Sequence, residues 1–141
     1  MFSNGATPKD KSMQYVVSVS LKLIWAFSVA AVAGVSLTPS PELPVSFWSA
    51  DKVGHFLGYF WLALLPFFAF HTTRVMFSAA FAMFLMGVLL EGAQSLIPGR
   101  HASGWDMVAN GAGVILGIAA GRVSIRIQGG RRAPERKRSR A

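Results

Sequence analysis

The chain has 141 residues, of which 52% are hydrophobic and only 14% are charged. Soluble domains usually carry about 25% charged residues, so this composition argues against an ordinary soluble globular protein. The absence of cysteine excludes a disulfide scaffold, a zinc ribbon and a cysteine nucleophile. The net charge of +8 is concentrated after residue 121, which points to a basic tail rather than to a nucleic-acid-binding face.

Four apolar segments are long enough to cross a bilayer once their polar ends are included. They cover residues 15–37, 53–70, 75–94 and 106–123. A soluble four-helix bundle is the alternative, but it requires polar faces at helical spacing, and residues 75–90 contain none. We therefore predict an all-α integral membrane bundle of four transmembrane helices.

The remaining segments divide the chain around this bundle. Residues 1–14 form a short segment before the transmembrane domain of residues 15–123, and residues 124–141 form a basic tail. The tail is rich in charge and poor in apolar residues, so we expect it to be disordered and to attract anionic lipids. RNA or DNA binding is not expected, because no aromatic residue separates its charges to stack on bases.

The basic residues also predict an orientation. An even number of spans places both termini on one side, together with twelve of the fourteen Lys and Arg residues, and leaves only Lys52 and Arg100 on the other. Under the positive-inside rule both termini are then cytoplasmic. We expect a multi-pass protein of the bacterial cytoplasmic (inner) membrane, with the loops 38–52 and 95–105 outside.

The first helix has a second interpretation. Lys9, Lys11 and Lys22 precede an apolar run through residues 31–33, Ala-Val-Ala, which fits the small-residue pattern of a signal-peptide cleavage site. Cleavage would leave three helices with the same orientation. The apolar run continues to Leu37, which favours a retained transmembrane helix.

Polar residues gather at the outer ends of three helices. In each pair the two residues are three or four positions apart, so they share a helical face. The pairs are Asp51 and His55 on the second helix, Glu91 and Gln94 on the third, and Asp106 and Asn110 on the fourth. Lys52 and Arg100 stand in the adjoining loops, so ion pairing within this cluster is expected. The aromatic residues Trp48, Tyr59, Trp61 and Trp105 lie near the same side, where interfacial rings are favoured.

Small residues accompany these polar pairs. Gly113, Gly117 and Gly121 recur every four residues and leave a groove that another helix can approach closely. Gly54 and Gly58 form a similar pair on the second helix. The groove suits either packing inside the bundle or packing against a second copy or another membrane protein.

The order and spacing of the polar residues resemble those of the VanZ-like family, small membrane proteins named after a teicoplanin-resistance protein. The resemblance covers residues 51–117. It is carried by Asp51-Lys52-x-x-His55-Phe56, by Glu91-x-x-Gln94, and by Pro98-x-Arg100-x-x-Ser103-x-x-Asp106-x-x-x-Asn110-x-x-Gly113. It implies four helices in the bacterial cytoplasmic membrane and a link to cell-envelope or antibiotic-resistance physiology.

Three functions remain open from the sequence. The first is binding of an anionic lipid or a lipid-linked envelope precursor, with the basic residues on the phosphate and the other polar residues around it. Its candidate ligand-binding residues are Asp51, Lys52, His55, Glu91, Gln94, Arg100, Ser103, Asp106 and Asn110. The second is a membrane-embedded hydrolase or transferase with His55 and Glu91 as the acid–base pair. The third is a partner subunit that packs through its glycines.

Each candidate residue also has a purely structural interpretation. His55 suits a structural hydrogen bond, proton transfer or metal ligation, and one imidazole does not decide between them. Asp106 suits capping of the fourth helix, and Asn110 suits an interhelical hydrogen bond. No cofactor and no metal are assigned from the sequence, which contains no HExxH, GxSxG or Walker motif.

Overall fold

The computed structural model describes residues 8–39, 48–98 and 103–138. In this part of the chain all regular structure is helical, and four helices are long and apolar enough to cross a membrane. The helices are α1 (Pro8–Leu37), α2 (Trp48–Leu64), α3 (Pro66–Ala69), α4 (Thr73–Gln94) and α5 (Gly104–Arg138). The predicted all-α transmembrane bundle is thereby confirmed.

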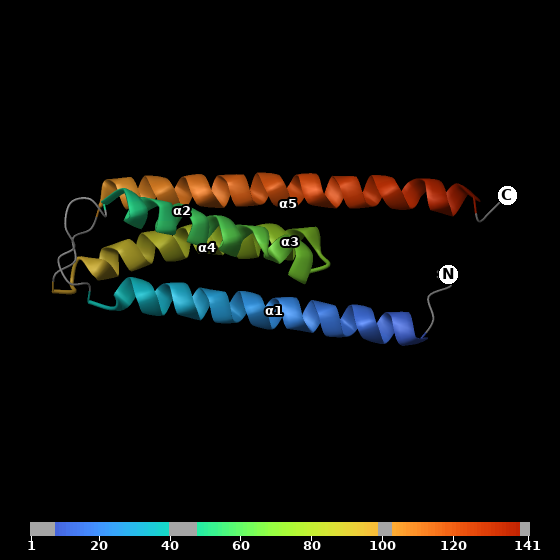
Figure 1. Ribbon diagram of the computed structural model, residues 1–141, viewed down its shortest axis with the longest axis horizontal. Helices are drawn as coiled ribbons and strands as arrows, with labels where there is room; N and C mark the ends of the chain where they lie inside the picture. Colours follow the sequence, from blue (N-terminus) through green and yellow to red (C-terminus); the bar gives the residue numbers. More distant parts are fainter. Residues whose placement is uncertain (1–7, 40–47, 99–102, 139–141) are drawn as a thin grey trace.

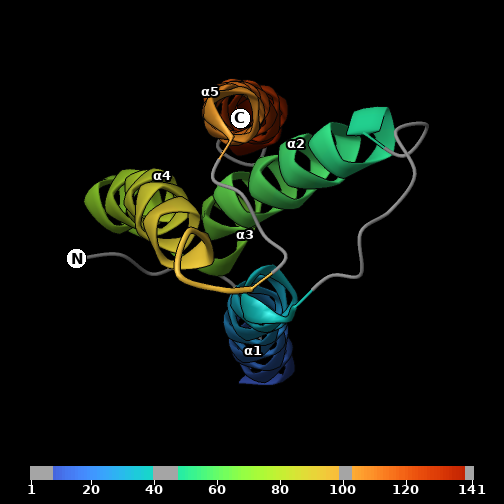
Figure 2. The ribbon, with the colours of Figure 1, turned by 90° about the vertical axis from the view of Figure 1, so that its left-hand side faces the viewer.

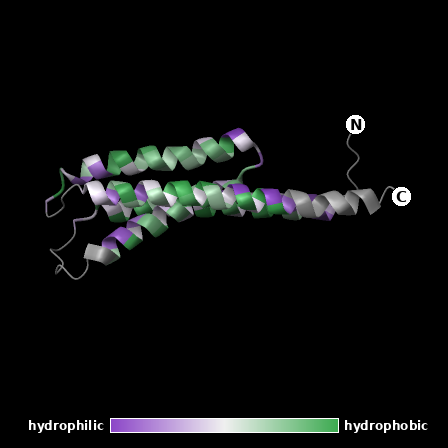
Figure 3. Cartoon of the chain, turned by 90° about the horizontal axis from the view of Figure 1, so that it is seen from above, coloured by the Kyte–Doolittle hydropathy of each residue, from purple (hydrophilic) through white to green (hydrophobic). Residues whose placement is uncertain are grey.

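The four long helices run side by side, and the N-terminal ends of α2 and α5 lie at the end of the bundle opposite both chain termini (Figure 1). Seen along the axis of the bundle, α5, α4 and α1 lie on three sides, and α2 runs from α3 near the centre toward the fourth side (Figure 2). Apolar residues dominate the middle of the helices, and polar residues are more frequent toward the ends (Figure 3). This distribution is the one that a hydrocarbon layer around the middle of the bundle requires.

The core is formed where α2 and α3 meet α4 and α5. Its fully or almost fully buried side chains are Tyr59, Leu62, Ala63, Phe67, Met76, Ala80, Met83 and Val114. By contrast, α1 buries only Ser18 and Ser36 inside the protein and exposes most of its apolar side chains. Those exposed apolar residues fit contact with lipid, which is as apolar as they are.

Helix α1 is attached to the bundle by hydrogen bonds and by packing of Trp25, Val29 and Val32 against the core. The Ser18 hydroxyl donates to the Ala69 carbonyl at 3.1 Å, and the Trp25 indole N–H donates to the Leu62 carbonyl at 2.9 Å. Near the opposite end, the Gln94 amide donates to the Ser36 carbonyl at 3.0 Å. The Ala69 and Ser36 carbonyls lie in the last turns of α3 and α1, where helix geometry leaves carbonyls without a backbone partner within the helix.

The Trp25 bond compensates for Pro66. A proline has no N–H, so the Leu62 carbonyl four residues earlier has no helical partner. The backbone nevertheless remains helical on both sides of Leu65, whose N–H donates to the Trp61 carbonyl at 3.1 Å. Segments α2 and α3 therefore act as one span, Ala50–Ala69, in which a neighbouring side chain replaces the hydrogen bond that the proline removes.

We expect Trp25→Phe to lower the free energy of unfolding by about 0.5–1.5 kcal/mol, because the Leu62 carbonyl loses its donor. The same change in a Pro66→Ala background should cost less, since that background supplies a backbone N–H for the carbonyl. Thermal unfolding of the four proteins in detergent measures this coupling. An equal cost of Trp25→Phe in both backgrounds would show that the indole does not replace the missing bond.

The last helix is longer than the sequence indicates. We expected a disordered tail from residue 124, whereas α5 continues to Arg138 (Figure 1). Extending an existing helix needs no new nucleation, so α5 continues although Gly129, Gly130 and Pro134 are poor helix formers. The basic segment therefore projects from the bundle as a helix at the end where the chain termini lie.

Candidate functional site

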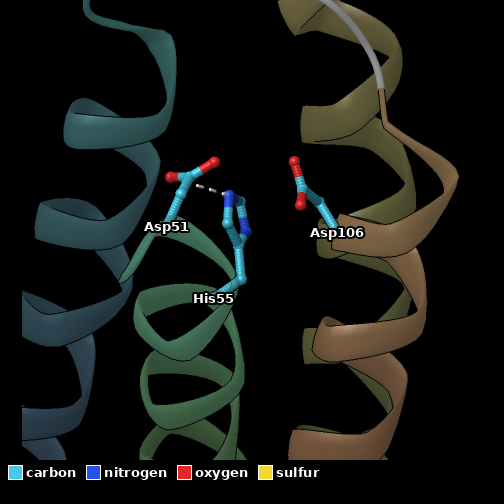
Figure 4. Close-up of side chains that lie close together, drawn as sticks. All are labelled: Asp51, His55 and Asp106. Carbon is cyan, nitrogen blue, oxygen red and sulfur yellow. Dashed lines mark ion pairs between the residues drawn. The ribbon is translucent and has the colours of Figure 1, made fainter. Parts of the chain in front are cut away.

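Helices α2 and α5 bring several of the predicted polar residues together at their N-terminal ends. The His55 ring donates from Nδ1 to the Asn110 amide oxygen at 3.0 Å, and its Nε2 lies 3.8 Å from Asp51 Oδ1. Asp106, on α5, faces the same space (Figure 4). Its Oδ1 lies 3.5 Å from Lys52 Nζ. We call Asp51, Lys52, His55, Asp106 and Asn110 the polar cluster.

Glycines on α5 allow the two helices to approach this closely. A Cβ atom at Gly113 would overlap the Phe56 carbonyl oxygen and lie 2.9 Å from the Phe60 nitrogen. A Cβ atom at Gly117 would lie 2.6 Å from the Phe60 oxygen. Contacts of this kind with backbone atoms leave no room for any side chain, so the backbones of α2 and α5 pack directly against each other.

The glycine stripe is consequently covered within the chain. Gly113 and Gly117 face α2, and Gly121 faces the Phe67 side chain of α3. The interpretation that these three glycines form a groove for a partner subunit is therefore wrong, because α2 and α3 occupy it. Sequence alone could not distinguish packing inside the bundle from packing against a partner. The glycine spacing predicts a groove but does not show which helix occupies it.

Two other predicted site residues bind backbone groups at the ends of neighbouring helices instead of joining the polar cluster. Glu91 is 4% exposed and accepts a hydrogen bond from the backbone N–H of Ser103, immediately before α5 begins. A carboxylate at this place also complements the positive end of the helix dipole. Gln94 is 3% exposed and donates to the Ser36 carbonyl at the end of α1. Both residues thus fix where neighbouring helices end or begin.

The proposed His55–Glu91 acid–base pair is not assembled in the part of the chain that the structure describes. There, His55 contacts Asn110 and Asp51, while Glu91 contacts Ser103. General acid–base catalysis requires the groups within hydrogen-bond reach of each other or of one substrate. Arg100, the remaining candidate, lies outside the described residues.

A cavity of about 380 Å³ lies between α1 and α2 beside the polar cluster. Its walls are mostly apolar, and Asp51 and His55 belong to its lining. The lining residues are Ala31, Val32, Val35 and Ser36 of α1, and Ala50, Asp51, Gly54, His55, Gly58 and Tyr59 of α2. Its size is that of a small-molecule pocket, and its mixture of apolar walls and few polar groups suits an amphiphile.

The glycines on α2 help to create this cavity. A Cβ atom at Gly54 would meet nothing within 4 Å, and one at Gly58 would meet only Val32 at 3.9 Å. These glycines therefore do not serve close helix packing, unlike those on α5. Because glycine has no side chain, space remains at these two positions along the face of α2 that is directed toward α1.

Tyr59, which lines the cavity, does not lie where the sequence predicted. We expected its ring at the membrane interface, yet it is 1% exposed and belongs to the core. Its ring packs over Gly87, where an added Cβ would lie 2.9 Å from the ring. The available signal was its position four residues after His55, which continues the face of Asp51 and His55 toward the interior.

One of the comparisons with known proteins supports this architecture. No curated protein and no solved structure matches the chain. A family model, VanZ/LLP1, matches residues 2–125, which includes every helix that forms the polar cluster and the cavity. The match extends the resemblance seen at residues 51–117 to most of the chain. The chain is thus a membrane-spanning four-helix protein that belongs to the VanZ/LLP1 family.

Proposed function

We propose that the protein binds a phosphate-bearing lipid or lipid-linked precursor of the bacterial envelope at the polar cluster. The hydrocarbon part of the ligand lies in the cavity between α1 and α2, and its polar head lies at the N-terminal ends of α2 and α5. The observation that carries this proposal is the position of the cavity. It adjoins Asp51 and His55 at its polar end and has apolar walls along the rest.

The sparse packing between α1 and α2 supports entry from the side. Contacts between α1 and α2 are sparse beside those between α2 and α5, and the cavity lies on the sparse side. A ligand already in the bilayer reaches such a cavity without leaving the membrane. Because residues 31–36 of α1 form one wall, the proposal requires that this helix is retained and not cleaved as a signal peptide.

Two basic residues are assigned to the phosphate. Lys52 lies next to Asp51 in α2, and Arg100 precedes α5 in the sequence. Lys52 Nζ lies 3.5 Å from Asp106 Oδ1, and this ion pair limits the contribution of Lys52 to phosphate binding. In the orientation that the basic residues favour, this end faces the outside of the inner membrane, where envelope precursors are used.

Filling the cavity tests the proposal. Gly54→Leu places a side chain in space that is open, so the fold should tolerate it, while a bound chain should be displaced. Overpacking of a site costs about 1–3 kcal/mol, and about 1.4 kcal/mol corresponds to a tenfold loss of affinity. We expect native mass spectrometry of the detergent-extracted protein to show a phosphate-bearing lipid on the wild type and about tenfold weaker retention on Gly54→Leu.

Gly34→Leu is the matched control. Gly34 lies in α1 near the same end of the bundle, a Cβ there meets nothing within 4 Å, and the residue does not line the cavity. The control should keep its lipid, and both variants should melt no lower than the wild type, because leucine favours helix more than glycine does. Equal lipid retention by all three proteins would refute the cavity as the binding site.

A further inference from the structure

Three metal-binding side chains converge between the N-terminal ends of α2 and α5. Asp51, His55 and Asp106 each offer one donor atom, and these atoms lie within 4.8 Å of one another. Figure 4 shows the two carboxylates on either side of the imidazole ring. Ligands of tetrahedral Zn²⁺ lie about 2.0–2.2 Å from the ion and hence about 3.3 Å from each other. The distance from His55 Nε2 to Asp51 Oδ1, 3.8 Å, is close to that value.

The orientation of His55 is the first independent indication of a ligand. The Asn110 amide oxygen accepts a hydrogen bond, so His55 Nδ1 carries the proton that it donates across 3.0 Å. In the neutral ring Nε2 then has a free lone pair, and it is Nε2 that faces Asp51. At 3.8 Å the contact is too long for a hydrogen bond. Metal-binding histidines are typically held in this way, with the second ring nitrogen donating to a neighbouring oxygen.

The environment of Asp106 is the second indication. The residue is 6% exposed, and within the described part of the chain its Oδ1 atom is buried and accepts no hydrogen bond. Its charged neighbour is Lys52 Nζ at 3.5 Å. A buried carboxylate is costly unless it is hydrogen-bonded, paired with a cation or bound to a metal. The position thus calls for a cation, and an ammonium group at 3.5 Å satisfies this need only in part.

We infer that Asp51, His55 and Asp106 form a site for a divalent transition-metal ion, with Zn²⁺ as the first choice. One neutral imidazole and two carboxylates balance the charge of such an ion, and mixed nitrogen and oxygen donors suit Zn²⁺. Three protein ligands leave a fourth coordination position open. Asn110 is a positioning residue that fixes the imidazole. Lys52 competes with the ion for Asp106.

The inference goes beyond the proposed function, since the metal site needs no lipid. It was not expected from the sequence, because Asp51 and His55 are separated from Asp106 by two helices and two loops. Only the close packing of α2 on α5 brings them together.

Metal binding to the full chain in detergent tests the inference. After treatment with a chelator and its removal, isothermal titration with Zn²⁺ should show one equivalent per chain. His55→Ala and Asp51→Asn should each abolish it or weaken it at least tenfold. Cobalt(II) added to the metal-free protein should give the visible absorption of a low-symmetry site, and this spectrum should be lost in His55→Ala.

Four further variants show whether the ion binds at these three side chains and not elsewhere on the chain. His71→Ala removes an exposed histidine in the turn before α4 and should leave binding unchanged. Asn110→Leu should weaken binding about 10–100-fold, and Asn110→Asp, which keeps an oxygen acceptor, should restore it together with the cobalt spectrum. Lys52→Met should strengthen binding. Absence of stoichiometric Zn²⁺ from the wild type, or binding that survives His55→Ala and Asp51→Asn, would overturn the inference.

Discussion

Gly113→Ala is expected to lower the melting temperature of the detergent-extracted protein more than alanine does at any other α5 glycine whose surroundings the structure describes. The added methyl group would overlap the Phe56 carbonyl oxygen and lie 2.9 Å from the Phe60 nitrogen. Both are backbone atoms of α2, so the clash is relieved only if the two helices move apart. Overpacking of this kind typically costs about 1–3 kcal/mol.

The effect should extend to the polar cluster. Asn110 lies three residues before Gly113, and its hydrogen bond to His55 spans the same pair of helices. Separation of α2 from α5 would therefore lengthen the bond between Asn110 and His55. It would also weaken the contact of Lys52 with Asp106, which is already 3.5 Å long. We expect Gly113→Ala to reduce both thermal stability and Zn²⁺ binding.

Gly111→Ala is the matched control on the same helix. Its Cβ atom would meet Phe84 at 3.7 Å, which is an ordinary van der Waals contact. The exchange should then stabilise α5 by up to about 1 kcal/mol, because alanine favours helix more than glycine does. Thermal unfolding of the two variants beside the wild type gives shifts of opposite sign if the packing is correct. Shifts of equal sign and size would mean that α5 does not pack on α2 through Gly113.

The transmembrane helices could be predicted because hydrocarbon imposes a simple requirement on sequence. About 20 apolar residues and turn-forming connections are visible without knowledge of any contact. Helix ends were less predictable. Helix α5 runs through residue 124 to Arg138, beyond the apolar region, because continuing an existing helix needs no new nucleation and no apolar face.

The candidate site was predictable in its composition but not in its pairing. Spacing showed that Asp51 shares a face with His55 and that Asp106 shares a face with Asn110. Which helix faces which depends on the glycines of α5, whose partner the sequence does not identify. The role of Glu91 depends on the backbone N–H of Ser103. A sequence does not show which backbone N–H groups are available as donors.

The cavity is a further feature that the spacing of residues in the sequence does not predict. Gly54 and Gly113 are both small residues on helices near polar pairs, and from the sequence they suggest the same role. In the structure, Gly113 brings two backbones into contact, whereas Gly54 faces open space. The difference arises because α5 lies against α2 while α1 stands away from it, and that arrangement follows from packing over the whole bundle.

The ion pair between Lys52 and Asp106 carries the second large expected effect. Asp106→Asn should destabilise the metal-free protein by about 1–3 kcal/mol, because it leaves the Lys52 ammonium beside a neutral amide. Breaking a fully buried ion pair costs about 3–5 kcal/mol. The lower range applies here since the Lys52 side chain is 24% exposed and water partly stabilises its charge. Melting in detergent with a chelator present measures the effect without any contribution from bound metal.

Removing the second charge distinguishes an ion pair from a general need for the Asp106 carboxylate. The double variant Lys52→Met/Asp106→Asn removes both charges of the pair, so much of the lost stability should return. Asp51→Asn is the matched control, because it makes the same chemical change on a side chain that is 57% exposed. Its effect should stay below about 1 kcal/mol, as for surface ion pairs. If Asp51→Asn and Asp106→Asn lower the melting temperature equally, or if the double variant recovers nothing, then Lys52 and Asp106 do not stabilise this end of the bundle as a pair.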